Sequence, residues 1–191
     1  YTNGGGNCIE GCFLPGTLIL TRDGEKAVET LVEGDEIAVI ENRSTAFRPF
    51  KWLGRSHAAV APLGFEEAAY PVRIPQDAFG ENLPQRDLLV TSEHCVYVDG
   101  RFVPVRMLVN GQSISIDRPI QEYDFYHVEL EQHGVIVSEG LQPESYLDTG
   151  NRGTFENTVV RAMRPHFSGG IVFSGGKTWE CDPAPPLPTQ Q

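Results

Sequence analysis

Short apolar runs of strand length dominate the hydrophobic pattern of this chain. Residues 17–21 and 88–91 are apolar β-type runs, and residues 126–130 alternate between apolar and polar side chains. Such patterns are typical of strands, and the sequences Asp23-Gly24 and Asp99-Gly100 favour tight hairpin turns between strands. The 14 prolines and 20 glycines suit many short strands joined by turns. We therefore predict an all-β fold.

The chain also contains an internal repeat. Residues 31–37 and 108–114 both read Leu-Val-x-Gly-x-x-Ile, at an offset of 77. Upstream of each copy lie an apolar run, a Thr and an Asp-Gly pair, in residues 18–24 and 88–100; the Asp-Gly offset is 76, which implies one gained residue. Chance similarity of two strand-turn-strand segments is the alternative. Because the shared features keep the same order, we predict a pseudo-two-fold domain of two β-units.

Length and charge limit the classes of partner. The 191 residues suit one domain with a sizeable core. An excess of 26 acidic over 15 basic residues gives a net charge of −11, which argues against nucleic acid as a partner. The longest apolar runs are too short for a transmembrane helix. We expect a monomer without a nucleic-acid partner, a membrane partner or a cofactor.

The four cysteines, Cys8, Cys12, Cys95 and Cys181, are too few for a disulfide scaffold. Cys95 begins an apolar run and is predicted to be a buried small hydrophobe. Cys8 and Cys12 lie four residues apart and could form a reversible disulfide that blocks Cys12. Zinc binding would require some of these thiols and His94 to converge. Strand alternation points His94 and Cys95 to opposite faces, so no metal site is predicted.

Cys12 is a candidate nucleophile because it follows Gly11. A cysteine that attacks the carbonyl before it requires a small neighbour with backbone freedom, which glycine provides. The departing nitrogen then requires a proton donor. Thr91 and His94 could contact this peptide bond if the two-fold arrangement brings the strand ends to a central cleft. Each also has an ordinary structural role, since Thr is common in strands and most histidines at strand ends serve no catalysis.

These residues carry a family resemblance. Residues 11–17, Gly-Cys-Phe-Leu-Pro-Gly-Thr, resemble the opening of Hint domains, the autoprocessing module that hedgehog proteins and inteins share. Thr91-x-x-His94, followed by Val-Tyr-Val, resembles the second motif of that family. Residues 129–144, which include His133, resemble its last block. Three motifs in this order imply a horseshoe-like, pseudo-two-fold Hint fold.

The resemblance also implies a division of the chain. It covers residues 11–155, and residues 144–152 are similar to a run in bacterial hedgehog/intein-type domains. We expect a leader that is cleaved off (1–11), an autoprocessing domain (12–157) and a proline-rich extension (158–191), disordered from about residue 182. A secreted or cell-surface bacterial precursor would fit this organisation.

The family's chemistry implies roles for the motif residues. Cys12 attacks the Gly11 carbonyl and forms a thioester by an N-to-S acyl shift. His94 protonates the departing amine, Thr91 binds and distorts the peptide bond, and His133 is a further candidate participant. Water or a small thiol then releases the upstream segment, which is the protein's own substrate. The resemblance thus implies a single-turnover autoprotease that acts in cis.

Two departures from the family narrow this prediction. Inteins end in His-Asn, whereas residues 140–145 read Gly-Leu-Gln-Pro-Glu-Ser, so splicing is not expected. Hedgehog proteins transfer the acyl group to a sterol with the help of an Asp, and residues 50–55 contain none. Hydrolysis or thiolysis at Gly11 remains. The alternative is an inactive or processed β-module for display, or for metal or redox binding, within a larger protein.

Overall fold

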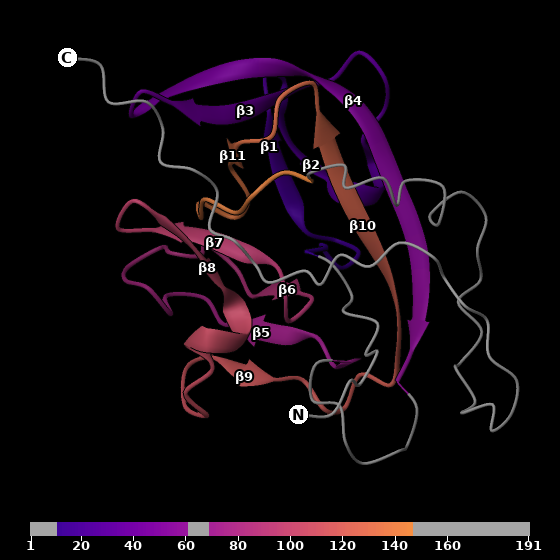
Figure 1. Cartoon of the computed structure of the whole chain (residues 1–191), viewed down its shortest axis with the longest axis vertical. Coiled ribbons are helices and arrows are strands. Elements are labelled where there is room, and N and C mark those ends of the chain that lie inside the picture. The colour runs from indigo at the N-terminus through magenta and orange to yellow at the C-terminus, as the bar shows by residue number, and fades with distance from the viewer. Residues whose placement is uncertain (1–10, 61–68, 147–191) are drawn as a thin grey trace, which may run out of the picture.

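The computed structural model describes residues 11–60 and 69–146, and strands make up most of this part of the chain (Figure 1). The all-β prediction is confirmed. The predicted extension, almost all of the leader, and Cys8 and Cys181 lie outside the described residues. In chain order the elements are β1 (Leu18–Thr21), β2 (Gly24–Ala27), the 3₁₀ helix η1 (Val28–Thr30), β3 (Glu36–Glu41), β4 (Ser44–Ala59), β5 (Val72–Ile74), β6 (Leu88–Val90), β7 (Cys95–Val98), β8 (Arg101–Pro104), the 3₁₀ helix η3 (Val105–Leu108), β9 (Ser115–Ile116), β10 (Glu122–Leu130) and β11 (Val135–Ile136).

Two long strands organise the sheets. The largest sheet has the order β10-β4-β3-β1-β2, with β11 paired to β3, and all its pairs are antiparallel. A second sheet has the order β6-β5-β9, and β7 and β8 form a separate hairpin. In Figure 1, β4 curves from the top of the molecule down one side with β10 beside it. No helix in the described residues is long and apolar enough to cross a membrane.

The elements repeat as the sequence predicted, but with a different alignment. The hairpin β1–β2 with η1 recurs as the hairpin β7–β8 with η3, each element beginning 77 residues later. Asp99 and Gly100 form the loop of the second hairpin, whereas Gly24 already belongs to β2. The two Asp-Gly pairs thus differ by one position within their turns. The prediction of a gained residue is wrong.

The two repeats pair with each other around a pseudo-two-fold axis. Phe13 forms a bridge with Val90, and Trp52 lies opposite Glu129 in the β4–β10 ladder. Both pairs are 77 residues apart, so each residue faces its own equivalent, as a two-fold axis requires. The run at residues 88–91 therefore corresponds to residues 11–14, and not to β1 as predicted. This equivalence is what places Cys12 beside Thr91.

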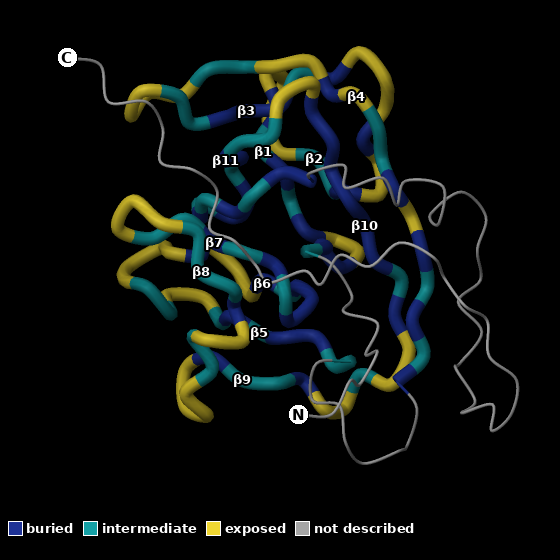
Figure 2. The backbone as a smooth tube through the Cα atoms, in the orientation of Figure 1, coloured by how far each residue is buried: buried dark blue, intermediate teal, exposed yellow. Residues whose placement is uncertain are grey.

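Strand β10 is more buried than its alternating sequence indicated. Every residue of 125–130 is buried, whereas alternation predicts one exposed face (Figure 2). The odd-numbered polar residues can be buried because they have partners, with His127 against Cys12 and Glu129 paired to Lys51 at 2.7 Å. The core around this strand is built from apolar residues of both repeats: Phe13, Ile19, Ile37, Val72, Ile74, Leu88, Val90, Val128 and Ile136.

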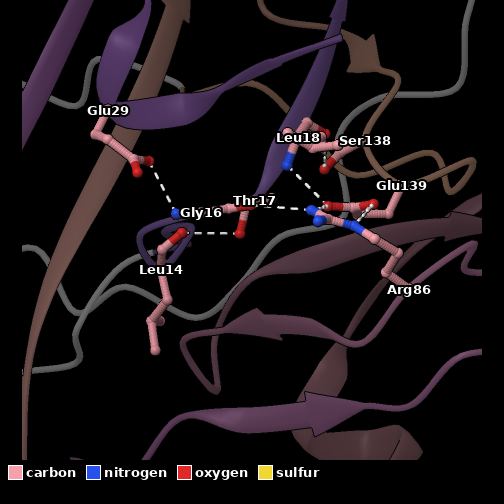
Figure 3. Close-up of polar contacts among 8 residues, drawn as sticks. All are labelled: Leu14, Gly16, Thr17, Leu18, Glu29, Arg86, Ser138 and Glu139. Carbon is pink, nitrogen blue, oxygen red and sulfur yellow. Dashed lines mark hydrogen bonds and ion pairs between the residues drawn. The ribbon is translucent and has the colours of Figure 1, made fainter.

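A polar network fixes the segment that follows Cys12 (Figure 3). The buried carboxylate of Glu139 accepts the Leu18 N–H at 2.8 Å and an Arg86 N–H at 2.6 Å. Arg86 also donates to the Gly16 carbonyl at 3.1 Å, and the Gly16 N–H donates to Glu29 at 2.9 Å. The turn at Glu139 and the side chain of Arg86 thereby hold the chain just after Cys12 in place.

Candidate functional site

Cys12 is fully buried in the middle of the pseudo-two-fold arrangement. Phe13 and Tyr126 exchange both backbone hydrogen bonds, at 2.9 and 2.8 Å. The Thr91 N–H donates to the Cys12 carbonyl at 3.0 Å. Residues of β10 and of the loop after β6 thus hold the Cys12 backbone from two sides.

The structure brings Thr91 directly to the peptide bond at which the sequence placed it. Its Oγ1 accepts the Cys12 N–H at 2.9 Å, and Thr91 has no solvent exposure. This N–H belongs to the amide that joins Gly11 to Cys12. A hydroxyl at this position holds the amide nitrogen in a fixed orientation.

The side chain in contact with the Cys12 sulfur is His127, which the sequence reasoning missed. His127 Nε2 lies 2.8 Å from Sγ. The ring packs edge-on against Tyr146, with 4.8 Å between ring centroids. Across the ladder lies Gly54, where a Cβ would come within 2.5 Å of the Trp52 ring and 3.3 Å of the His127 Cβ. A histidine within an otherwise core-forming strand is the signal that could have identified it.

His94 lies next to Gly11, the residue before the candidate scissile bond. It is 1% exposed, its ring centroid is 4.4 Å from that of Phe13, and its N–H donates to the Thr91 carbonyl at 3.1 Å. Neither ring nitrogen makes a well-formed hydrogen bond with a described group. A Cβ on Gly11 would lie 3.1 Å from the His94 Cα and 3.5 Å from its Cγ. Gly11 therefore packs directly against this histidine.

Both buried imidazoles are neutral at pH 7. Burial and, to a smaller extent, the proximity of His94 lower the pKa of His127 to about 3. Burial also lowers the pKa of His94 to about 4, while the charge of Glu144 and the backbone of Cys12 and Glu144 favour the protonated ring. A neutral imidazole at hydrogen-bond distance can accept the proton of the Cys12 thiol.

His133 contacts Glu144, and not the cysteine. It lies between β10 and β11, with Nε2 3.5 Å from the Glu144 Oε2 and its ring 5.6 Å from that of Phe102. The other carboxylate oxygen, Oε1, accepts the Cys95 N–H at 3.0 Å. Cys95 itself is half-buried, so its predicted burial is wrong; in β7 it is Val96 that lies in the core, at 1% exposure.

The described residues give no support to the metal alternative. Within residues 11–60 and 69–146, no group of three or more His, Cys, Asp or Glu side chains is placed to hold a metal ion. The possible disulfide between Cys8 and Cys12 involves Cys8, which lies outside the described residues.

The two buried histidines should make the fold sensitive to acid. Their pKa values lie near 3 and 4 in the folded chain but at 6.5 in an unfolded one. The unfolded state therefore binds more protons below pH 6.5, and the free energy of unfolding falls as the pH drops from there toward 4. We expect a slope approaching about 1.4 kcal/mol per pH unit for each histidine.

Urea unfolding of the Cys12→Ala chain between pH 7 and 4.5 measures this slope without interference from cleavage. A variant that also carries His94→Gln and His127→Gln should show a much flatter profile. A pH-independent free energy of unfolding in the chain that keeps both histidines would contradict the expectation.

Comparison with known proteins agrees with this geometry. The Hint domain family matches residues 11–150. The DnaB intein from Synechocystis sp. PCC 6803 superposes with a TM-score of 0.53 at 9% identity, covering 72% of this chain and 100% of the intein. The DnaX mini intein from Spirulina platensis gives 0.50 at 11% identity, covering 69% and 98%. A search of curated proteins found no significant match.

These identities are low, and the structural likeness shows the fold alone. The Hint and intein-like fold supports a domain of the autoprocessing type in general terms. The family match extends over most of the 191 residues and includes Cys12, Thr91, His94 and His127. The chain therefore belongs to the Hint domain family.

Proposed function

We propose that this protein cleaves its own chain between Gly11 and Cys12 through a thioester, without splicing. One observation carries the proposal. The Cys12 thiol lies 2.8 Å from a neutral imidazole, while the hydroxyl of Thr91 holds the Cys12 amide at 2.9 Å. Nucleophile, base and the nitrogen that must leave are thus held together in one buried site.

The first step is activation and attack by the sulfur. An ordinary cysteine thiol has a pKa of about 8.5, so it requires a base at neutral pH. His127 Nε2 accepts the thiol proton, and Sγ attacks the carbonyl carbon of Gly11. The Thr91 hydroxyl keeps the amide nitrogen in place during this attack. The tetrahedral intermediate then carries both the sulfur and the amide nitrogen.

The second step breaks the carbon–nitrogen bond. The nitrogen leaves as the amine of Cys12 and requires a proton, which His94 donates. Because burial lowers the pKa of His94 to about 4, this ring is neutral at pH 7 and must first take up a proton. The proton that His127 takes from sulfur passes to His94 and from there to the nitrogen, so the step consumes no further proton. The product is a thioester between the Gly11 carbonyl and the Cys12 sulfur.

Release of the upstream segment completes a single turnover in cis. A nucleophile, water or a small thiol, attacks the thioester and separates the segment that ends at Gly11. Residues 140–145 contain no Asn that could cyclise and free the C-terminal side, which supports cleavage without splicing. The protein thus acts on its own chain as a monomer.

The direct test is the intact mass of the 191-residue chain before and after incubation with a small thiol. We expect conversion into a fragment of residues 1–11 and a fragment of residues 12–191. Hydroxylamine, which cleaves thioesters, should release residues 1–11 as a hydroxamate and leave the same fragment of residues 12–191. A chain that stays whole under both reagents while natively folded would overturn the proposal and favour an inactive β-module.

A further inference from the structure

Glu144 has no role in the reaction described so far, yet it lies beside the acyl group. We infer that water is the acceptor of the Gly11 acyl group and that the carboxylate of Glu144 activates this water. The inference rests on the proposed thioester and decides between the two acceptors. It also assigns a positioning role to His133, which contacts Glu144 instead of Cys12.

The position of the carboxylate comes from the space around Gly11. A Cβ on Gly11 would lie 3.1 Å from the Glu144 Oε1. That Cβ position and the Gly11 carbonyl carbon are both one bond from the same Cα, so the carboxylate is a neighbour of the residue whose carbonyl becomes the thioester. Because Gly11 has no side chain, none stands between its Cα and this carboxylate.

Glu144 is held firmly but is not sealed from solvent. Oε1 accepts the Cys95 N–H, and the Glu144 N–H donates to the Cys95 carbonyl, both at 3.0 Å. Oε2 lies 3.5 Å from the His133 Nε2. The Glu144 side chain is 22% exposed, whereas Cys12 is fully buried. The Glu144 side chain can therefore meet water while its orientation stays fixed.

The charge of Glu144 suits a base. Burial alone would raise its pKa, but the contact with His133, the interaction with His94 and the hydrogen bond from the Cys95 N–H together outweigh burial and lower the pKa. The group is ionised at neutral pH and can accept a proton from water. A thiol attacks as its thiolate, which this negative charge repels, whereas neutral water is not repelled. The same carboxylate thus favours hydrolysis over thiolysis.

The hydrolytic step balances without any further reactant. The oxygen of water bonds to the Gly11 carbonyl carbon as one of its protons passes to Glu144. The carbon–sulfur bond then breaks, and the sulfur leaves as a thiolate that recovers a proton from Glu144. The products are a carboxylic acid at Gly11 and the thiol of Cys12, now the N-terminal residue.

The test compares the full 191-residue chain with its Glu144→Gln variant. In buffer made with oxygen-18 water and no thiol, we expect one oxygen-18 atom at the Gly11 carboxyl of the wild-type product and a rate about 10²-fold lower in E144Q. Cleavage by hydroxylamine should persist in E144Q, because Cys12, Thr91 and His127 still form the thioester. Glu93→Gln is the matched control. It removes the same charge one residue before His94, where Glu93 pairs with Arg106 at 2.8 Å, and should hydrolyse normally.

Each other outcome separates this inference from the proposed thioester. If E144Q hydrolysed at the wild-type rate, the role of Glu144 would be overturned, and the proposed thioester would be unaffected. Loss of hydroxylamine cleavage in a natively folded E144Q chain would place Glu144 before the thioester and also overturn it. Resistance of the wild-type chain to hydroxylamine would refute the proposed function itself. If E144Q fails to fold, His133→Gln replaces it, with slower hydrolysis and unchanged hydroxylamine cleavage expected.

Discussion

Replacement of Cys12 by alanine is expected to abolish cleavage at Gly11 completely. The sulfur forms the new bond to the Gly11 carbonyl, and it is the group held 2.8 Å from the His127 Nε2. The variant should still fold, because a methyl group in place of the thiol leaves the backbone contacts with Thr91 and Tyr126 unchanged. Intact mass after incubation with hydroxylamine should show only the 191-residue chain.

The matched control for this experiment is Cys95→Ala. Cys95 is the other cysteine of the described residues, it is half-buried, and its contact with Glu144 runs through the backbone N–H, which alanine retains. This variant should cleave at the wild-type rate. Cleavage of the Cys12→Ala chain at an undiminished rate would refute the assignment of the nucleophile.

Replacement of His127 by glutamine should slow cleavage by about 10²- to 10⁴-fold, the usual contribution of a positioned acid or base. Glutamine has a similar length and can keep a hydrogen bond to Sγ, but it cannot accept the thiol proton. The thiol must then lose its proton to solvent, which is unfavourable below its pKa of about 8.5. The rate of hydroxylamine cleavage, followed by mass against time, measures the effect.

This variant makes a second prediction about pH. If His127 is the base, the remaining activity of His127→Gln should rise more steeply with pH between 7 and 9 than that of the wild type, because it depends on thiolate formed in bulk water. His57→Gln is the control. His57 also lies in the β4–β10 ladder but pairs with Asp124 at 2.9 Å, so its loss should leave the rate unchanged. Equal rates for His127→Gln and the wild type would exclude His127 as the base.

Local sequence was sufficient to single out four residues that the structure brings together. Gly11 and Cys12 stood out because their chemistry depends on being neighbours, and Thr91 and His94 because their spacing resembles the second motif of Hint domains. The internal repeat supplied the reason for these distant segments to meet. The offset of 77 was correct, but the Asp-Gly pairs were misleading, because such pairs occupy different positions in different turns.

The histidine that contacts the sulfur could not be identified in this way. His127 alternates with Tyr126 and Val128, and in a strand with one exposed face it would point to solvent. The face of β10 that carries His127 is buried only because Cys12, Gly54 and Tyr146 pack around the ring. His133 was the more conspicuous candidate because it follows the strand, yet its partner is Glu144.

The sequence by itself determined the all-β class and the duplicated unit and singled out the candidate peptide bond between Gly11 and Cys12, because strand periodicity, repeats and neighbouring residues are local properties. The tertiary structure decided which side chains meet that bond. Thr91 and His127 are 79 and 115 residues from Cys12, and they reach it through pairing across the pseudo-two-fold axis. Which faces of β10 are buried depends on that pairing, and burial in turn determines that both imidazoles are neutral.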